Sequence, residues 1–313
     1  MADDDTEHMP PPVGELNEHL FKTRGTGGFF PRKYFDEVVF DEDGVPELDE
    51  LDLANIAPDA TIVNFGSRRT GKSTLTRHLC YHHLQEFFPR GVVYSDTDEL
   101  NKHYAAYFPE RYIHPGLDDE VQASVLNFQK SLKKDPDHEE RLAKDPNYNR
   151  IITIYDDVIN DNTLRHSKPL STAFTNGRHY EMCLILSTQY PKAINPQMRD
   201  NVDAAFMFAQ STMGSSLHLH ECFGGYMTRP LFLALLDKYT EDHRALVFIN
   251  INKSEKRLKY KYFWIKADKE VPPFRMGSDA FWQEDARDEE DKDFEAEGGR
   301  EPDGYQPYYY RKQ

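Results

Sequence analysis

The sequence has few cysteines and no long apolar run. Among its 313 residues there are three cysteines, Cys80, Cys183 and Cys222, and no Cys-x-x-Cys pair. This scarcity excludes a disulfide framework and is typical of a reducing compartment. No apolar stretch approaches the ~20 residues that cross a bilayer, and the acidic N-terminal "MADDDTEHMPPP" lacks the apolar core of a secretory signal. We therefore expect a soluble intracellular protein with no membrane partner.

Positive charge is scarce overall, but the net charge of −16 is unevenly distributed. Residues 1–60 hold 16 acidic and 4 basic residues, and residues 267–313 hold 14 and 7. The remaining 24 acidic and 27 basic residues lie in 61–266, so a slightly basic middle stands between two acidic flanks. Because the acidity belongs to the flanks, it favours solubility and does not exclude a nucleic-acid partner for the middle segment.

Length and pattern predict one α/β domain between two flanks. We expect a flexible acidic, proline-rich arm over 1–35, a folded domain over 36–266, and an acidic, tyrosine-ending tail over 267–313. Within the domain, short apolar runs alternate with helical stretches, which favours a mostly parallel sheet with helices on both faces. The expected strands are 37–40, 61–65, 91–96, 111–116, 151–157, 182–189 and 204–210, followed by an antiparallel edge hairpin over 245–251 and 257–266.

A phosphate-binding motif follows the strand 61–65. The segment "GSRRTGKST" (66–74) fits G-x-x-x-x-G-K-[ST] and precedes a helical stretch, as this motif requires. Its glycines allow backbone N–H groups to surround a polyphosphate, and the helix N-terminus adds its positive end. We expect Lys72 to reach the β- and γ-phosphates and Ser73 to bind Mg²⁺. The predicted nucleotide-binding residues are Gly66, Ser67, Arg68, Arg69, Thr70, Gly71, Lys72, Ser73 and Thr74.

Two adjacent acids end another apolar run. The segment "IITIYDD" (151–157) leads a buried strand into Asp156 and Asp157, whose like charges repel unless a cation compensates them. In a P-loop protein, Mg²⁺ and Lys72 provide that positive charge. We therefore predict that Asp156 holds the metal and that Asp157 is the general base for hydrolysis of the γ-phosphate of ATP.

Other P-loop classes fit these motifs less well. A GTPase needs Asp-x-x-Gly after its metal strand, but here Val158 and Ile159 follow the acids. The segment "NKSE" (252–255) has Glu255 where the guanine-reading motif has aspartate. Small-molecule kinases usually lack the paired acids and use an arginine-rich lid. An ATPase therefore accounts best for the motifs.

A third polar residue ends a strand about thirty positions beyond the paired acids. In "LILSTQ" (184–189), an apolar run ends at Gln189. ATPases that insert a strand between the P-loop strand and the metal strand carry a polar sensor at this place. We predict that Gln189 forms a hydrogen bond with the γ-phosphate or with the attacking water.

The motif series resembles the FtsK–HerA superfamily of DNA-pumping ATPases, and more closely the poxvirus-type genome-packaging ATPases of large DNA viruses and virophages. The series consists of "GSRRTGKST", "IITIYDDV", "FTNGRHYEMCLILSTQYP" and "INPQMRDNVDAAFMF". The likeness covers roughly residues 60–250, and "GRH" (177–179) and "MRDNVD" (198–203) are its most particular parts. One departure is Arg69, where many relatives have a further glycine in the phosphate loop.

The resemblance implies a RecA-like core that forms a homo-oligomeric ring, a pentamer or a hexamer, with ATP between neighbouring subunits. Double-stranded DNA would pass through its centre into a preformed capsid, with a capsid or packaging-vertex protein as a further partner. The implied location is the virion or the viral factory in the host cytoplasm. In such rings, an arginine of the adjacent subunit stabilises charge on the transferred phosphoryl group. Arg178 and Arg199 are the candidates by position, and a salt bridge explains each of them equally well.

The segment "NKSEKRLKYKYFW" (252–264) is a candidate for contact with DNA. As a strand it would place Arg257, Lys259 and Lys261 on one face, where they suit phosphates, although a solvated edge strand explains the pattern equally well. Two other functions remain open: a cellular HerA-like DNA-processing or conjugative coupling ATPase, and a P-loop protein that uses the nucleotide as a binding switch. Stimulation of ATP hydrolysis by duplex DNA separates a motor from a switch.

Overall fold

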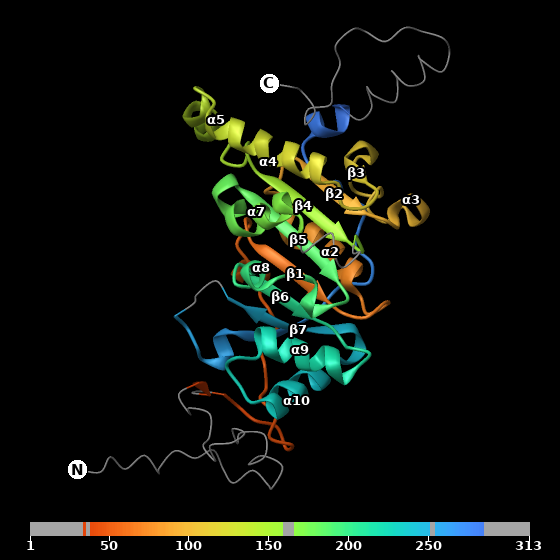
Figure 1. Ribbon diagram of the computed structural model, residues 1–313, viewed down its shortest axis with the longest axis vertical. Helices are drawn as coiled ribbons and strands as arrows, with labels where there is room; N and C mark the ends of the chain where they lie inside the picture. The colour runs from red at the N-terminus through yellow and green to blue at the C-terminus, as the bar shows by residue number, and fades with distance from the viewer. Residues whose placement is uncertain (1–33, 36–37, 159–165, 251–253, 285–313) are drawn as a thin grey trace, which may run out of the picture.

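The computed structural model describes residues 34–35, 38–158, 166–250 and 254–284 (Figure 1). The predicted arm, apart from Tyr34 and Phe35, lies outside these residues, as does the tail beyond Glu284. Within the described ranges, every helix is too short or too polar to span a bilayer.

An eight-stranded sheet forms the centre of the molecule, with the strand order β3-β2-β4-β5-β1-β6-β7-β8. The strands from β3 to β6 pair in parallel, and β7 and β8 add antiparallel to one edge. The fold class predicted from the sequence, a RecA-like P-loop sheet with an antiparallel edge hairpin, is confirmed. The strands are β1 (Thr61–Phe65), β2 (Gly91–Ser95), β3 (Ile113–His114), β4 (Ile151–Asp156), β5 (Met182–Thr188), β6 (Ala204–Met207), β7 (Arg244–Ile249) and β8 (Tyr262–Lys266).

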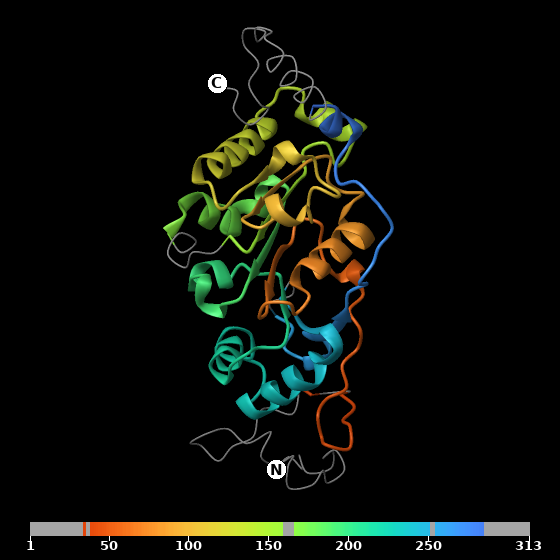
Figure 2. The ribbon, with the colours of Figure 1, turned by 90° about the vertical axis from the view of Figure 1, so that its right-hand side faces the viewer.

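Helices cover both faces of the sheet, with α4 and α7 on one face and α2 on the other (Figure 2). The side chains of Asp118, Ser167, Thr212 and Thr228 accept backbone N–H groups and so begin α4, α7, α9 and α10. The labelled α-helices are α2 (Lys72–Leu79), α3 (Asp98–Asn101), α4 (Asp119–Lys133), α5 (His138–Lys144), α7 (Lys168–Asn176), α8 (Pro196–Arg199), α9 (Met213–Phe223) and α10 (Arg229–Tyr239). A π-helical turn, Cys80–Leu84, continues α2. The 3-10 turns are Leu53–Asn55, Glu110–Tyr112, Gly177–Tyr180, Pro191–Ala193, Glu241–His243 and Leu258–Tyr260.

The core lies around β1, β4 and β5, whose residues are all buried, as expected for strands that are covered on both faces. Asn64, in the middle of β1, is polar and fully buried. Its Nδ2 atom donates to Thr76 Oγ1 on α2 (3.1 Å) and to Ser187 Oγ on β5 (3.4 Å). These bonds hold α2 against the two strands whose carboxyl ends border the phosphate loop.

Residues 267–284, called the strap below, run from the end of β8 along α2 toward β2 (Figure 2). Met276 and Phe281 of the strap are buried in the core. The Met276 N–H group donates to Tyr107 O, and the Phe274 ring stacks on the Tyr107 ring at a centroid distance of 4.8 Å. The domain boundary predicted at residue 266 is therefore too early, because the strap completes the hydrophobic core.

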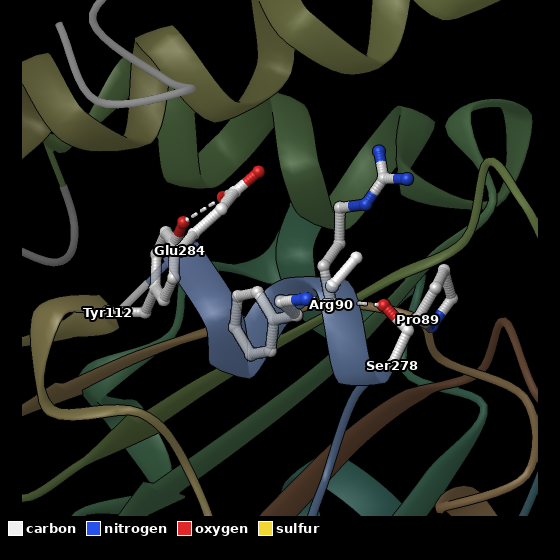
Figure 3. Close-up of a pocket in the computed structure, with 7 residues that line it drawn as sticks. Pro89, Arg90, Tyr112, Ser278 and Glu284 are labelled. Atoms are coloured by element: carbon white, nitrogen blue, oxygen red, sulfur yellow. Dashed lines mark hydrogen bonds between the residues drawn. The ribbon is translucent and has the colours of Figure 1, made fainter. Parts of the chain in front are cut away.

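The far end of the strap closes over the turn before β2. In Figure 3, the Tyr112 hydroxyl donates to Glu284 Oε2 across 2.6 Å, and the Ser278 N–H group donates to Pro89 O across 2.9 Å. A cavity of about 150 Å³ lies among these residues, Arg90 and Phe281. Two hydrogen bonds and a stacked Tyr112–Phe281 ring pair thus fix the strap at this point.

The edge hairpin forms as predicted, but its second strand is shorter than expected. Strand β8 begins at Tyr262, and the residues before it form the 3-10 turn Leu258–Tyr260. Lys261 is buried, with its Nζ atom near the rings of Tyr226 and Phe248. The prediction that Arg257, Lys259 and Lys261 share one face of a strand is therefore wrong, because the chain turns where the sequence alternates.

Candidate nucleotide-binding and hydrolysis site

The phosphate loop connects β1 to α2, and close contacts explain its two glycines. A Cβ atom on Gly66 would lie 2.5 Å from Thr70 Oγ1 and 2.8 Å from Phe208 Cβ, so no side chain fits there. Gly71 precedes α2 with φ 112°, a backbone conformation that side chains rarely adopt. The sequence motif therefore marks positions where the loop folds tightly against Phe208, a residue that the motif does not include.

Arg69 also has a left-handed backbone, with φ 64°. A non-glycine residue in this conformation costs on the order of 1 kcal/mol, which glycine avoids. The glycine that the family resemblance places at this position suits this geometry, and Arg69 adopts the same turn with its side chain exposed. The presence of Arg69 in place of glycine therefore does not prevent the tight fold of the loop at Gly66 and Gly71.

Lys72 is buried at the start of α2 and lies on the phosphate loop itself. Its Nζ atom donates to Gly66 O (2.8 Å) and to Ser67 O (3.0 Å). Burial lowers the pKa of Lys72, and the charges of Asp157 and Asp156 act in the opposite direction. The ammonium group thus contacts the carbonyl groups of the loop, and its charge interacts with those of Asp156 and Asp157 at the end of β4.

Asp156, the last residue of β4, joins the phosphate loop to a second segment of the chain. Its Oδ2 atom accepts hydrogen bonds from Ser73 Oγ (2.7 Å) and from the Tyr104 hydroxyl (2.8 Å). The carboxylate is 4% exposed, and its Oδ1 atom is buried without a hydrogen-bond partner among the described residues. Burial raises the pKa of Asp156, the hydrogen bonds from Ser73 and Tyr104 lower it, and the charge of Asp157 raises it further.

This arrangement fits a magnesium ion. A carboxylate oxygen and a hydroxyl are ligands of the hard oxygen type that Mg²⁺ takes, and it is usually bound through one or two carboxylates with phosphate and water. Asp156 Oδ1 is a buried acceptor that no described residue bonds, and such an orphaned oxygen is energetically costly. Ser73 and Asp156, which the sequence predicts as metal ligands, therefore lie together, as a metal site requires.

Asp157 lies beside Asp156 but in a different environment. Its side chain is exposed, and its backbone has φ 51°. The charge of Asp157 acts to raise the pKa of Lys72 on the phosphate loop. An exposed carboxylate at this position has access to water, as a general base requires.

Gln189 follows β5, which pairs with β4 on one side and with β1 on the other. The Gly66 N–H group donates to Thr188 O across 3.1 Å, so the end of β5 touches the first residue of the phosphate loop. Because all three strands are parallel, Asp156, Gln189 and the loop share one edge of the sheet. The predicted sensor is half-buried at this edge.

The two predicted arginines do not join this cluster within the chain. Arg178 and Arg199 precede β5 and β6, so they stand before strands whose carboxyl ends point toward the phosphate loop. Arg178 is exposed on the turn Gly177–Tyr180. Arg199 is half-buried, and its Nη1 atom donates to Cys222 Sγ across 3.0 Å.

Sequence reasoning missed two residues that contact the predicted metal ligands. Tyr104 binds Asp156, and His103 Nε2 lies 3.3 Å from Ser73 O. Burial lowers the pKa of His103, and the charge of Asp156 opposes that shift. Both residues lie after β2, which pairs with β4 so that Ser95 stands opposite Asp156. Only the strand order brings this segment to the site, and no local pattern encodes it.

The comparisons with known proteins place the chain among viral proteins. No protein-family model matches it. It is 30% identical over 225 residues to uncharacterized protein L437 of Acanthamoeba polyphaga mimivirus, a match that covers 71% of this chain and 77% of that protein. The chain belongs to this viral protein family. Uncharacterized protein 075L of Invertebrate iridescent virus 6 is 29% identical over 215 residues, with 68% of this chain and 80% of that protein covered.

Among solved structures, the genome-packaging NTPase B204 of Sulfolobus turreted icosahedral virus 2 matches with a TM-score of 0.46 and 17% identity. The match covers 69% of this chain and all of that one. The kinship with proteins of large DNA viruses that the sequence motifs predict is confirmed by these relatives.

Proposed function

We propose that this chain is a Mg²⁺-dependent ATPase that moves double-stranded DNA and packages a viral genome into a preformed capsid. One observation carries the ATPase assignment: Ser73 of the phosphate loop and the buried Asp156 meet at 2.7 Å, with Lys72 and Asp157 beside them. If the Gly-Lys-Ser sequence were a chance turn, we would not expect it to contact the paired acids that follow β4, which is separated from β1 by β5 in the sheet.

The residues of the chain divide the work of hydrolysis as follows. Backbone N–H groups of the loop and the N-terminus of α2 bind the phosphates. Lys72 leaves the carbonyl oxygens of Gly66 and Ser67 and turns to the β- and γ-phosphates, because the phosphates compete for the same ammonium group. Ser73 and Asp156 would hold Mg²⁺, which would supply positive charge to the phosphate oxygens.

Asp157 and Gln189 act on the attacking water. The water oxygen forms a bond to the γ-phosphorus, the bond from that phosphorus to the bridging oxygen breaks, and ADP leaves with the electron pair. Asp157 takes the proton of the water, and Gln189 orients the water or the γ-phosphate by a hydrogen bond. An arginine of a neighbouring subunit, Arg178 or Arg199, stabilises the charge that develops on the transferred group.

The assignment to DNA packaging is supported by the motif resemblance and by the viral relatives. The slightly basic middle of the chain, with 24 acidic and 27 basic residues in 61–266, allows contact with phosphates without reading of sequence. In this proposal a ring of five or six subunits encloses the duplex and docks on a capsid or packaging-vertex protein. The work takes place in the virion or in the viral factory.

Phosphate release with and without duplex DNA tests the proposal. The full chain with ATP and Mg²⁺ should release phosphate, and duplex DNA should raise the rate, while the Asp157→Asn variant stays inactive in both conditions. A nucleotide switch would hydrolyse ATP at the same rate with and without DNA. That result would refute the motor while leaving the ATPase assignment intact, and the absence of any phosphate release would refute both.

A further inference from the structure

A group of three metal-ligating side chains lies outside the nucleotide site, where the strap crosses the phosphate-loop helix. His78 belongs to α2, and His82 follows one turn later in the π-helical segment Cys80–Leu84. Residues four positions apart on a helix lie on the same face, and the two imidazole rings are 4.4 Å apart between centroids. Asp268 of the strap meets both of them.

The separations of the three ligand atoms lie on either side of those in a tetrahedral cation site. Asp268 Oδ2 lies 2.7 Å from His82 Nε2 and 3.5 Å from His78 Nδ1, and one ligand atom of each residue lies within 4.8 Å of the others. Around a tetrahedral zinc ion with ligand bonds of about 2.0–2.2 Å, neighbouring ligand atoms stand roughly 3.3–3.5 Å apart. The three side chains need to move by only about an ångström to enclose such an ion.

His78 presents the form of imidazole that binds a metal. The N–H group of Asp268 donates to His78 Nδ1 across 3.0 Å, so this nitrogen carries a lone pair and no proton. A bound ion would displace the Asp268 N–H group from this lone pair, and the loss of that hydrogen bond limits the affinity of the site for the ion.

An ordinary surface ion pair does not account for the whole arrangement. The side chains of His82 and Asp268 are 37% and 55% exposed, and an ion pair at such positions contributes little to stability. The second imidazole is different, because the side chain of His78 is only 10% exposed and yet directs a nitrogen at the same carboxylate. Two nitrogens and one carboxylate oxygen, open to solvent on one side, match a three-residue zinc site with water in the fourth position.

We propose that His78, His82 and Asp268 bind a divalent cation of the Zn²⁺ class and that this ion fastens the strap to the phosphate-loop helix. Two imidazole ligands select Zn²⁺, Co²⁺ or Ni²⁺ over Mg²⁺, which prefers oxygen ligands. The site is separate from the predicted magnesium site at Ser73 and Asp156. It depends on the strap, because Asp268 is the ligand that the strap supplies.

Titration of the full chain with Zn²⁺ and with Co²⁺ tests this site, followed by calorimetry and by the visible absorption of tetrahedral Co²⁺. The wild type should bind one ion with this absorption, and His82→Gln and Asp268→Asn should each weaken binding at least tenfold. His83→Gln is the matched control, since His83 Nε2 contacts Ile56 O instead and its loss should leave the affinity unchanged. Circular dichroism confirms that each variant is folded.

Thermal unfolding supplies the second readout. Zn²⁺ should raise the melting temperature of the wild type and of His83→Gln, and should raise that of His82→Gln and Asp268→Asn much less, while Mg²⁺ has no such effect. Equal Zn²⁺ affinity in the wild type, His82→Gln and Asp268→Asn, or no uptake by the wild type, would overturn the proposal. Neither measurement uses nucleotide, so the outcome is independent of the proposed ATPase activity.

Discussion

The Ser73 hydroxyl donates a hydrogen bond to Asp156 Oδ2 across 2.7 Å, although the two residues are 83 positions apart in the chain. This contact joins the first turn of α2 to the end of β4. Tyr104 and Lys72 belong to the same site. The carboxylate is buried and its second oxygen has no partner among the described residues. A buried carboxylate oxygen without a partner is energetically costly, and in the proposed function a bound cation offsets that cost.

Asp156→Asn should stabilise the metal-free protein and abolish its response to magnesium. Burial raises the folded-state pKa of Asp156 above its unfolded value, so the ionised carboxylate reduces stability at neutral pH. An uncharged amide of the same shape removes that cost. In EDTA the variant should melt at a higher temperature than the wild type. With ATP present, addition of Mg²⁺ should raise the melting temperature of the wild type but not of Asp156→Asn, and equal increases would contradict the assignment.

Lys72→Ala should abolish nucleotide binding, whereas Asp157→Asn should preserve binding and stop hydrolysis. In the proposed mechanism, Lys72 contacts the ground-state phosphates, but Asp157 acts only in the chemical step, where loss of a general base costs roughly 10²–10⁴ in rate. Asparagine tolerates the left-handed backbone at this position (φ 51°), so Asp157→Asn changes the charge without strain. Binding of a fluorescent ATP analogue and phosphate release check the pair. Near wild-type turnover by Asp157→Asn would contradict the role of the acid.

Tyr104→Phe should destabilise the protein by about 2 kcal/mol, because it removes a hydrogen bond to a buried carboxylate. Tyr107 provides a matched control on the same segment. It is equally buried, but its hydroxyl has no hydrogen-bond partner among the described residues. Tyr107→Phe should therefore change stability by less than about 0.5 kcal/mol. Urea unfolding of both variants in EDTA makes the comparison, and equal losses would show that the Asp156 contact contributes nothing.

The phosphate loop and the paired acids were predictable because their chemistry is local. Gly66, Gly71 and Lys72 stand at fixed spacings that one turn of backbone imposes, and Asp156 directly follows an apolar run. The mostly parallel direction of the strands was also predictable, because continuous apolar runs alternate with helical stretches along the sequence. The catalytic roles of Asp157 and Gln189 remain predictions, because geometry alone assigns no chemical step.

Contacts between distant segments were not predictable. Tyr104 reaches Asp156 only because β2 pairs with β4, and the sequence around Tyr104 carries no sign of this. The strap was predicted to be part of the tail because it is rich in acidic residues and its few apolar residues follow neither the helical nor the strand period. Lys261 was read as exposed because alternation indicates a strand, although the backbone turns just before it.

Truncation after Glu284 should leave the domain stable, but truncation after Lys266 should destabilise it by roughly 3–6 kcal/mol. The longer deletion removes Met276 and Phe281, and burial of each such side chain contributes about 1.5–3 kcal/mol. Urea unfolding of the two truncated chains beside the full chain measures the difference. If both truncations unfold at the same urea concentration, the strap does not belong to the core.

The last prediction concerns the arginine that, in the proposed ring, completes the site from a neighbouring subunit. Arg178 is the better candidate on structural grounds, since it is exposed and stands before β5, at the edge away from its own phosphate loop. Arg199 is already bonded to Cys222 within the chain. An arginine that acts in trans contributes nothing to the site of its own subunit and much to that of its neighbour.

Mixing Asp157→Asn with Arg178→Ala should therefore restore part of the DNA-stimulated hydrolysis, although each variant alone is nearly inactive. Some interfaces in the mixed ring combine an intact acid from one subunit with an intact arginine from the next. Arg199→Ala serves as the parallel control and should not complement Asp157→Asn. The arginine stabilises charge that appears only in the transition state, so Arg178→Ala should lower kcat far more than it lowers ATP affinity. If protein shown to assemble gains no activity in either mixture, the sites are not shared between subunits.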